Sequence, residues 1–156
     1  MLNYCKAKWA ENEKRLEKVI RESKNHNEWY YRDLVKMVVD EVLNHGLNSL
    51  NGRSLVWDSE HITEIDDGDY QGSKIFAIHL DTYQPEPEEY LFTRVHYGSC
   101  SCCDTLQGIQ CSGDIINGGT PTEQQVKDYM ALCRDIVVRM KQPFKDDYLS
   151  FEEAEV

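Results

Sequence analysis

The stretch that decides the fold runs from Tyr90 to Cys111 and reads YLFTRVHYGSCSCCDTLQGIQC. Its first part, Tyr90 to Tyr97, is rich in β-branched and aromatic residues and predicts a strand, which Gly98 interrupts. A short helical pattern opens at Asp104, and we expect it to end at Gly108. Between strand and helix lie three cysteines: Cys100, Cys102 and Cys103. The sequence therefore predicts a cysteine-rich loop at the end of a strand.

Working outward, the chain upstream alternates helical and strand patterns. Apolar residues at helical spacing predict one helix from Trp9 to about Lys24 and a second from about Glu28 to Leu43. Residues 46–60 have no clear period and are expected to form an irregular, partly buried connection. Strands are predicted at His61 to Ile65 and Lys74 to Tyr83, separated by an acidic turn.

Downstream of the loop, the sequence predicts one more helix. Thr120 is the expected N-cap, Pro121 fits the first helical position, and Glu123 completes a capping box. An apolar stripe that includes Cys133 continues until Pro143.

This order of elements predicts an α+β domain. It has two N-terminal helices, a small antiparallel sheet of about three strands, and a C-terminal helix packed on the sheet. We expect one domain over residues 1–144 and an acidic tail over residues 145–156.

The composition narrows the class of partner. The chain has 156 residues, and its 28 acidic and 17 basic residues give a formal net charge of -11. This balance argues against direct binding of nucleic acid or of an anionic membrane, because phosphate is repelled. The acidic surface either only keeps the protein soluble or faces a protein partner with a basic surface. No apolar stretch approaches the length of a membrane span, so we expect a cytoplasmic protein.

Zinc is the first candidate cofactor for the loop. Cys100 and Cys103 have the C-x2-C spacing that aims two sulfurs at one point, and His96 and Cys111 could complete a four-ligand set. The alternatives are a thiol nucleophile, with Cys100 or Cys103 activated near a helix start and His96 as base, or a purely structural loop. No complete catalytic constellation is recognised, so the sequence favours a role other than catalysis.

The acidic turn is the second candidate site. Asp66, Asp67 and Asp69 are dense enough to face basic side chains of a partner. The turn lacks the spaced ligands and the closing glutamate of an EF-hand, so calcium is not expected.

Four blocks carry a family resemblance: DGDYQG from Asp67, DTYQP from Asp81, YGSCSCCDTLQGI from Tyr97 and PTEQQVKDYMALC from Pro121. Together they resemble a family of small uncharacterised proteins encoded by tailed phages. Members usually have glycine at the position of Cys102, so the resemblance favours Cys100 and Cys103 as the shared pair.

The resemblance implies an accessory protein in the cytoplasm of an infected bacterial host. Such a protein is expected to bind a macromolecular partner, for example to inhibit a host or defence factor. The alternative from the residues is a small-ligand-binding protein or a thiol-dependent enzyme that uses the loop from Cys100 to Cys103.

Overall fold

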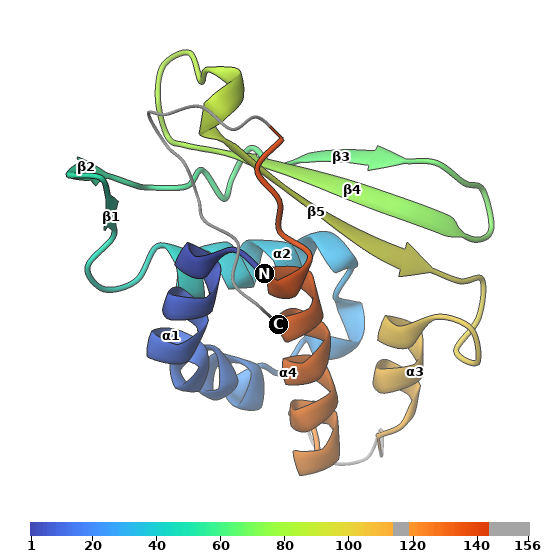
Figure 1. The fold of residues 1–156 in the computed structure, drawn as a ribbon. Helices are drawn as coiled ribbons and strands as arrows, with labels where there is room; N and C mark the ends of the chain where they lie inside the picture. Colours follow the sequence, from blue (N-terminus) through green and yellow to red (C-terminus); the bar gives the residue numbers. More distant parts are fainter. Residues whose placement is uncertain (114–118, 144–156) are drawn as a thin grey trace.

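The computed structural model describes residues 1–113 and 119–143, and it confirms the α+β class (Figure 1). The predicted tail at residues 145–156 lies outside the described residues. In chain order the elements are α1 (Asn3–Glu22), η1 (His26–Glu28), α2 (Tyr31–Val38), η2 (Val39–Leu43), β1 (Ser49–Leu50), β2 (Arg53–Ser54), β3 (Thr63–Asp66), β4 (Gly72–His79), η3 (Pro87–Glu89), β5 (Tyr90–Tyr97), α3 (Thr105–Cys111) and α4 (Glu123–Val138).

The main sheet is antiparallel, in the order β3-β4-β5. Its register pairs Asp66 with Lys74, Lys74 with Val95, and Gly72 with Tyr97. Because side chains alternate between the two faces of a strand, Asp66, Lys74, Val95 and Tyr97 share one face at one end of the sheet. His96 points to the opposite face.

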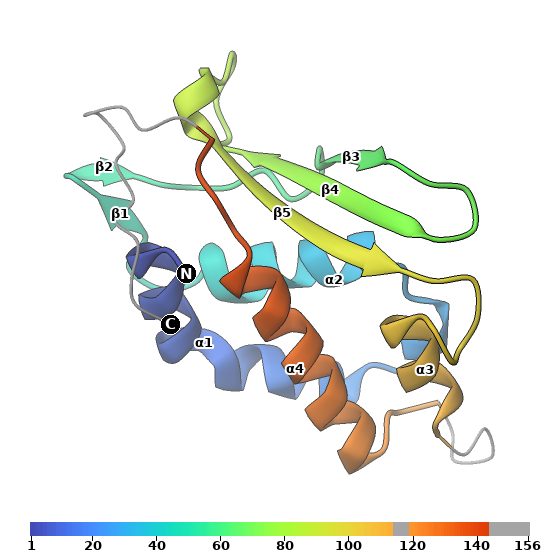
Figure 2. The same cartoon turned by 45° about the vertical axis from the view of Figure 1, so that its right-hand side comes forward.

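Helices α1, α2 and α4 all lie on one side of this sheet (Figures 1 and 2). On β5, Leu91, Thr93 and Val95 are buried toward them, and the Thr93 hydroxyl donates to the carbonyl of Ile136 in α4 at 2.7 Å. The predicted packing of the C-terminal helix on the sheet is therefore confirmed. In the described ranges, no helix is long and apolar enough to cross a membrane.

The second predicted helix is interrupted, which corrects the expected span from Glu28 to Leu43. A 3-10 turn ends at Glu28, Trp29 and Tyr30 are extended, and α2 begins at Tyr31. The Asp33 carboxylate fixes this start because it accepts the Tyr30 N–H at 2.7 Å. The helix then widens into a π-helical turn at Val39–Leu43.

Other expected boundaries were also wrong: α1 begins at Asn3, not Trp9, and β4 ends at His79, not Tyr83. Gly108 does not end α3 but lies inside it, where a Cβ would come within 2.9 Å of the Ser101 carbonyl oxygen. The N-cap of α4 is Thr122, not Thr120, and it forms a capping box with Gln125. Residues 46–60, predicted as irregular, contain the short β1–β2 hairpin.

Candidate functional site

Three segments meet at one end of the molecule. The β3–β4 turn, the end of β5 with the loop that follows it, and the start of α3 lie together there (Figure 2). The extended segment before α2 joins them, because the Gln110 side chain in α3 donates to the carbonyls of His26 and Trp29. This end holds both candidate sites that the sequence predicted.

A cavity of about 420 Å³ opens between these segments. Four of its lining residues are aromatic: Trp29, Tyr30, Tyr31 and Tyr97. Four are acidic: Glu28, Asp66, Asp69 and Asp104. Lys74 is the one basic side chain in this lining, and its ammonium is 2.7 Å from the Glu64 carboxylate. The cavity is therefore aromatic and negatively charged.

The inner wall of the cavity is built on a buried carboxylate. Asp104 caps α3 by accepting the Gln107 N–H at 2.8 Å, and its other oxygen accepts the Gly98 N–H at 2.9 Å. The Tyr31 hydroxyl donates to Asp104 at 3.3 Å and accepts from the Leu106 N–H at 3.2 Å. Burial raises the pKa of Tyr31 to about 12, so its hydroxyl is protonated and able to donate. Asp104 thus joins β5, α3 and α2.

The outer wall is formed by the acidic turn. The Tyr97 hydroxyl donates to Asp66 at 2.6 Å and to the Gly68 carbonyl at 2.7 Å. The hydrogen bond to Asp66 raises the pKa of Tyr97 to about 12 and lowers the pKa of Asp66. Of the predicted partner-binding residues, Asp66 and Asp69 line the cavity, whereas Asp67 closes the turn by accepting the Ser73 N–H at 2.6 Å.

Beside the cavity, residues 98–104 fold into a tight turn. The N–H groups of Cys103 and Asp104 both donate to the Cys100 carbonyl, and this turn brings the sulfurs of Cys100 and Cys103 to 3.1 Å. Gly98 is required because a Cβ there would lie 2.5 Å from the Cys103 carbonyl oxygen. The pairing predicted from the C-x2-C spacing is therefore formed, and both cysteines are exposed.

The structure does not bring the other two predicted metal ligands to this pair. His96 lies on the opposite sheet face from the cavity and bonds to the Ser73 hydroxyl at 2.8 Å, while Cys111 is exposed at the end of α3. Across residues 1–113 and 119–143, no three His, Cys, Asp or Glu side chains are grouped as a metal site would require. Zinc at the loop stays a prediction, to be tested by elemental analysis of the wild type and a Cys100→Ser, Cys103→Ser variant.

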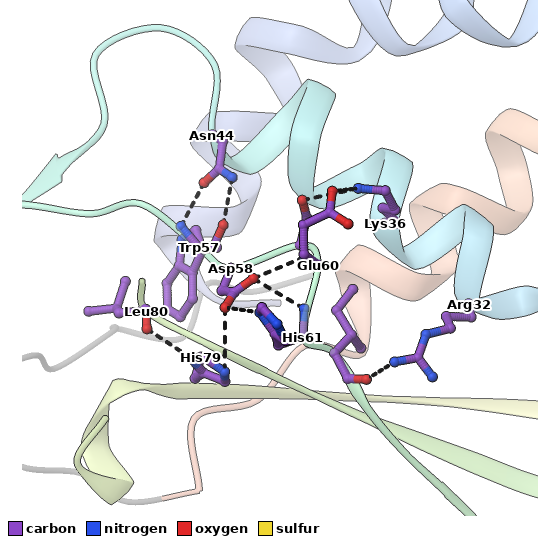
Figure 3. Close-up of polar contacts among 11 residues, drawn as sticks. Arg32, Lys36, Asn44, Trp57, Asp58, Glu60, His61, His79 and Leu80 are labelled. Carbon is purple, nitrogen blue, oxygen red and sulfur yellow. Dashed lines mark hydrogen bonds and ion pairs between the residues drawn. The ribbon is translucent and has the colours of Figure 1, made fainter. Parts of the chain in front are cut away.

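Two more histidines surround a different carboxylate (Figure 3). Asp58 accepts from His61 Nδ1 at 2.8 Å and lies 3.9 Å from His79 Nε2. Burial acts to raise the pKa of Asp58, but its hydrogen bonds outweigh this and lower the pKa. His79 and Gly72 are the two ends of β4, which places His79 about 23 Å from the cavity end of the sheet. Neither histidine serves the cysteine loop.

Sequence reasoning missed the three consecutive aromatic residues Trp29, Tyr30 and Tyr31. The expected continuous helix from about Glu28 would have included all three, whereas Trp29 and Tyr30 are extended in the structure. The sequence signal for this segment was the run WYY, which is followed by Asp33, a residue type that caps helix starts. Of the three, Tyr30 is 73% exposed, whereas Tyr31 is buried.

Comparisons with protein-family models, with curated proteins and with solved structures found no match.

Proposed function

We propose that this protein binds a macromolecular partner that inserts a lysine or arginine side chain into the cavity between β3–β4, α2 and α3. The observation that carries the proposal is the lining itself, in which four aromatic rings and four carboxylates converge on one space. A cation gains both from aromatic faces and from carboxylates.

Lys74 illustrates the type of contact. Its ammonium lies 5.4 Å from the centre of the Tyr97 ring while it pairs with Glu64. The chain's own ammonium group thus already uses one aromatic face and one carboxylate at this end of the sheet. A partner's cation would find the same two types of group at Tyr30 and Asp69.

Exposed tyrosines at the cavity and next to it suit a protein partner. Tyr30 is 73% exposed, and Tyr70, the neighbour of Asp69 in the sequence, is 83% exposed. Exposed tyrosines are frequent anchors of protein interfaces. The resemblance to tailed-phage proteins supports a partner from the bacterial host, such as a defence factor that the binding would inhibit.

The direct test uses a short arginine peptide and the same peptide with citrulline, the neutral isostere, titrated into isotopically labelled protein and followed by NMR. We expect the arginine peptide to shift the amide signals of residues 28–31, 66–69 and 104–110, with weaker binding at higher salt. Equal binding of the citrulline peptide, or shifts confined to another region, would contradict the proposal.

Variants separate the cavity from the rest of the surface. Tyr30→Ala and Asp69→Asn should each weaken peptide binding about threefold to tenfold, since each removes one exposed cation contact. Tyr83→Ala is the matched control: Tyr83 is 97% exposed and follows β4 at its far end. The same three variants, tagged at either end, then show whether a host protein captured from lysate uses the cavity.

The cavity volume also suits a small cationic ligand, which is the second candidate function. Small-molecule pockets typically measure about 300–1,000 Å³. A thermal-shift screen of amines and guanidines would favour this candidate if a small compound stabilised the protein and Tyr30→Ala abolished the shift.

A further inference from the structure

The Cys100–Cys103 pair has a geometry that the proposed binding function does not use. The two sulfurs are 3.1 Å apart, and a disulfide bond measures about 2.0 Å. The turn that holds them is already closed by hydrogen bonds from the N–H groups of Cys103 and Asp104 to the Cys100 carbonyl. Bond formation therefore needs a sulfur approach of about 1 Å within a turn that is preformed.

Most contacts of the Cys103 sulfur favour its thiolate; the exception is the Cys100 carbonyl oxygen, 3.4 Å away, which accepts only from the protonated thiol. The Cys103 sulfur is 3.3 Å from the Cys100 N–H nitrogen and 3.9 Å from the Ser99 hydroxyl, in addition to the Cys100 thiol. Hydrogen bonding, first of all from the Cys100 thiol, lowers the pKa of Cys103 below its usual value of 9.0. Cys5 and Cys133, by contrast, are buried, and burial raises the pKa of each to about 12.

Access is also favourable. Both sulfurs of the pair belong to exposed residues, and neither cysteine lines the cavity. A small reagent could therefore reach the pair in the free protein. The pair combines the three features of a reactive dithiol: proximity, exposure and one sulfur that is stabilised as a thiolate.

We propose that Cys100 and Cys103 form a redox-active dithiol that exchanges with small disulfides and closes to an intrachain Cys100–Cys103 disulfide. The Cys103 thiolate attacks one sulfur of a disulfide RSSR, the S–S bond breaks, and one RS⁻ leaves with the bonding electron pair. The Cys100 thiol then loses its proton to water and attacks the Cys103 sulfur, which releases the second RS⁻. Two cysteine thiols are oxidised, one disulfide is reduced, and the two protons end on the released thiols.

The test uses the full chain, reduced and then desalted, with oxidised glutathione as the disulfide at neutral pH. Free thiols are blocked with iodoacetamide at intervals, and intact and peptide masses are measured. We expect the wild type to lose two alkylatable thiols, at Cys100 and Cys103, and to regain them with dithiothreitol. Because the proposal does not involve the cavity, Tyr30→Ala should behave as the wild type does.

Single substitutions assign the roles of the two sulfurs. Cys100→Ser should accumulate a mixed disulfide with one glutathione on Cys103, because the second attack is lost. Cys103→Ser should react about tenfold more slowly, because the stabilised thiolate is gone. Cys102→Ser and Cys111→Ser are the matched controls, since both cysteines are exposed and lie in or near the same loop.

Three results would overturn the proposal: first modification at Cys102 or Cys111, a disulfide that includes Cys102, or a Cys100→Ser variant with no more mixed disulfide than the wild type. Retention of zinc by the pair with both thiols unreactive would likewise overturn it. Thermal melts of each variant establish that the fold is intact, so an altered reaction reports on the sulfurs.

Discussion

Two parts of the loop between β5 and α3 are neighbours in sequence but differ in burial: its ends are packed, and its middle is exposed. Gly98 and Asp104 are the closely packed ends: Asp104 is 4% exposed, and Gly98 has no room for a Cβ. The residues between them, including Cys100 and Cys103, are exposed. The packed pair Gly98 and Asp104 therefore forms a frame that holds an exposed, chemically accessible turn. Substitutions at the frame should change stability, and substitutions within the turn should change reactivity.

The largest loss of stability should come from Asp104→Ala. It removes the acceptor of the Gly98 and Gln107 N–H groups and of the Tyr31 hydroxyl. Buried donors left without a partner cost about 1–3 kcal/mol each, so we expect a loss of about 3 kcal/mol in the free energy of unfolding, measured by urea denaturation. Asp104→Asn keeps one acceptor oxygen and should lose about half as much. A loss below about 0.5 kcal/mol for Asp104→Ala would show that the frame is unimportant.

The second-largest loss of stability is expected for Gly98→Ala. The added Cβ would meet the Cys103 backbone and sulfur at 2.5–2.6 Å, so the turn must move, at a cost of about 1–3 kcal/mol. Gly108→Ala is the informative control, because its clash with the Ser101 carbonyl is milder and alanine stabilises a helix by about 1 kcal/mol relative to glycine. If Gly98→Ala were as stable as Gly108→Ala in denaturation, the close approach at Gly98 would not be a constraint.

A smaller effect is expected for Tyr31→Phe. The change keeps the ring in place and removes only the hydroxyl that joins Asp104 and the Leu106 N–H. The expected loss is about 1 kcal/mol in urea denaturation. In a double-mutant cycle with Asp104→Asn, the two losses should not be additive, because the side chains share a hydrogen bond. Simple additivity would show that Tyr31 and Asp104 are not coupled through this hydrogen bond.

The same loop shows how far the sequence leads and where it stops. The strand Tyr90–Tyr97 and the cap at Asp104 were predictable because both depend on local patterns: strand propensity and the spacing from Asp104 to Gln107. The C-x2-C spacing likewise predicted the contact of Cys100 with Cys103. Gly108 gave a wrong boundary because glycine is common at the end of a helix, whereas here it lies inside α3, where the helix packs close to the Ser101 carbonyl.

The cavity could not be predicted because it depends on packing between segments far apart in the chain. Tyr31 and Asp104 are 73 residues apart, and their contact follows from how α2 lies beneath the sheet. His96 could be excluded only when the register placed it on the opposite face from Tyr97. Local sequence patterns thus predicted the helices and strands, and only the tertiary arrangement showed which of the predicted site residues lie close together.

The smallest expected effect, and the one that tests the turn by itself, is a change in the pH dependence of Cys103 alkylation. The hydrogen bond from the Cys100 thiol is the first cause of the lowered pKa of Cys103. In the wild type, the rate of reaction with iodoacetamide should therefore reach half its maximum below pH 9.0, because the rate follows the thiolate fraction.

Cys100→Ala removes the thiol donor, so the midpoint of the pH–rate curve should move upward and the rate at pH 7 should fall. Cys100→Ser supplies a hydroxyl donor at the same position and should keep the midpoint close to that of the wild type. Since Cys100 is exposed, neither change should alter stability by more than about 0.5 kcal/mol. Identical midpoints for the alanine and serine variants would mean that the backbone N–H of Cys100, which both retain, is what stabilises the thiolate.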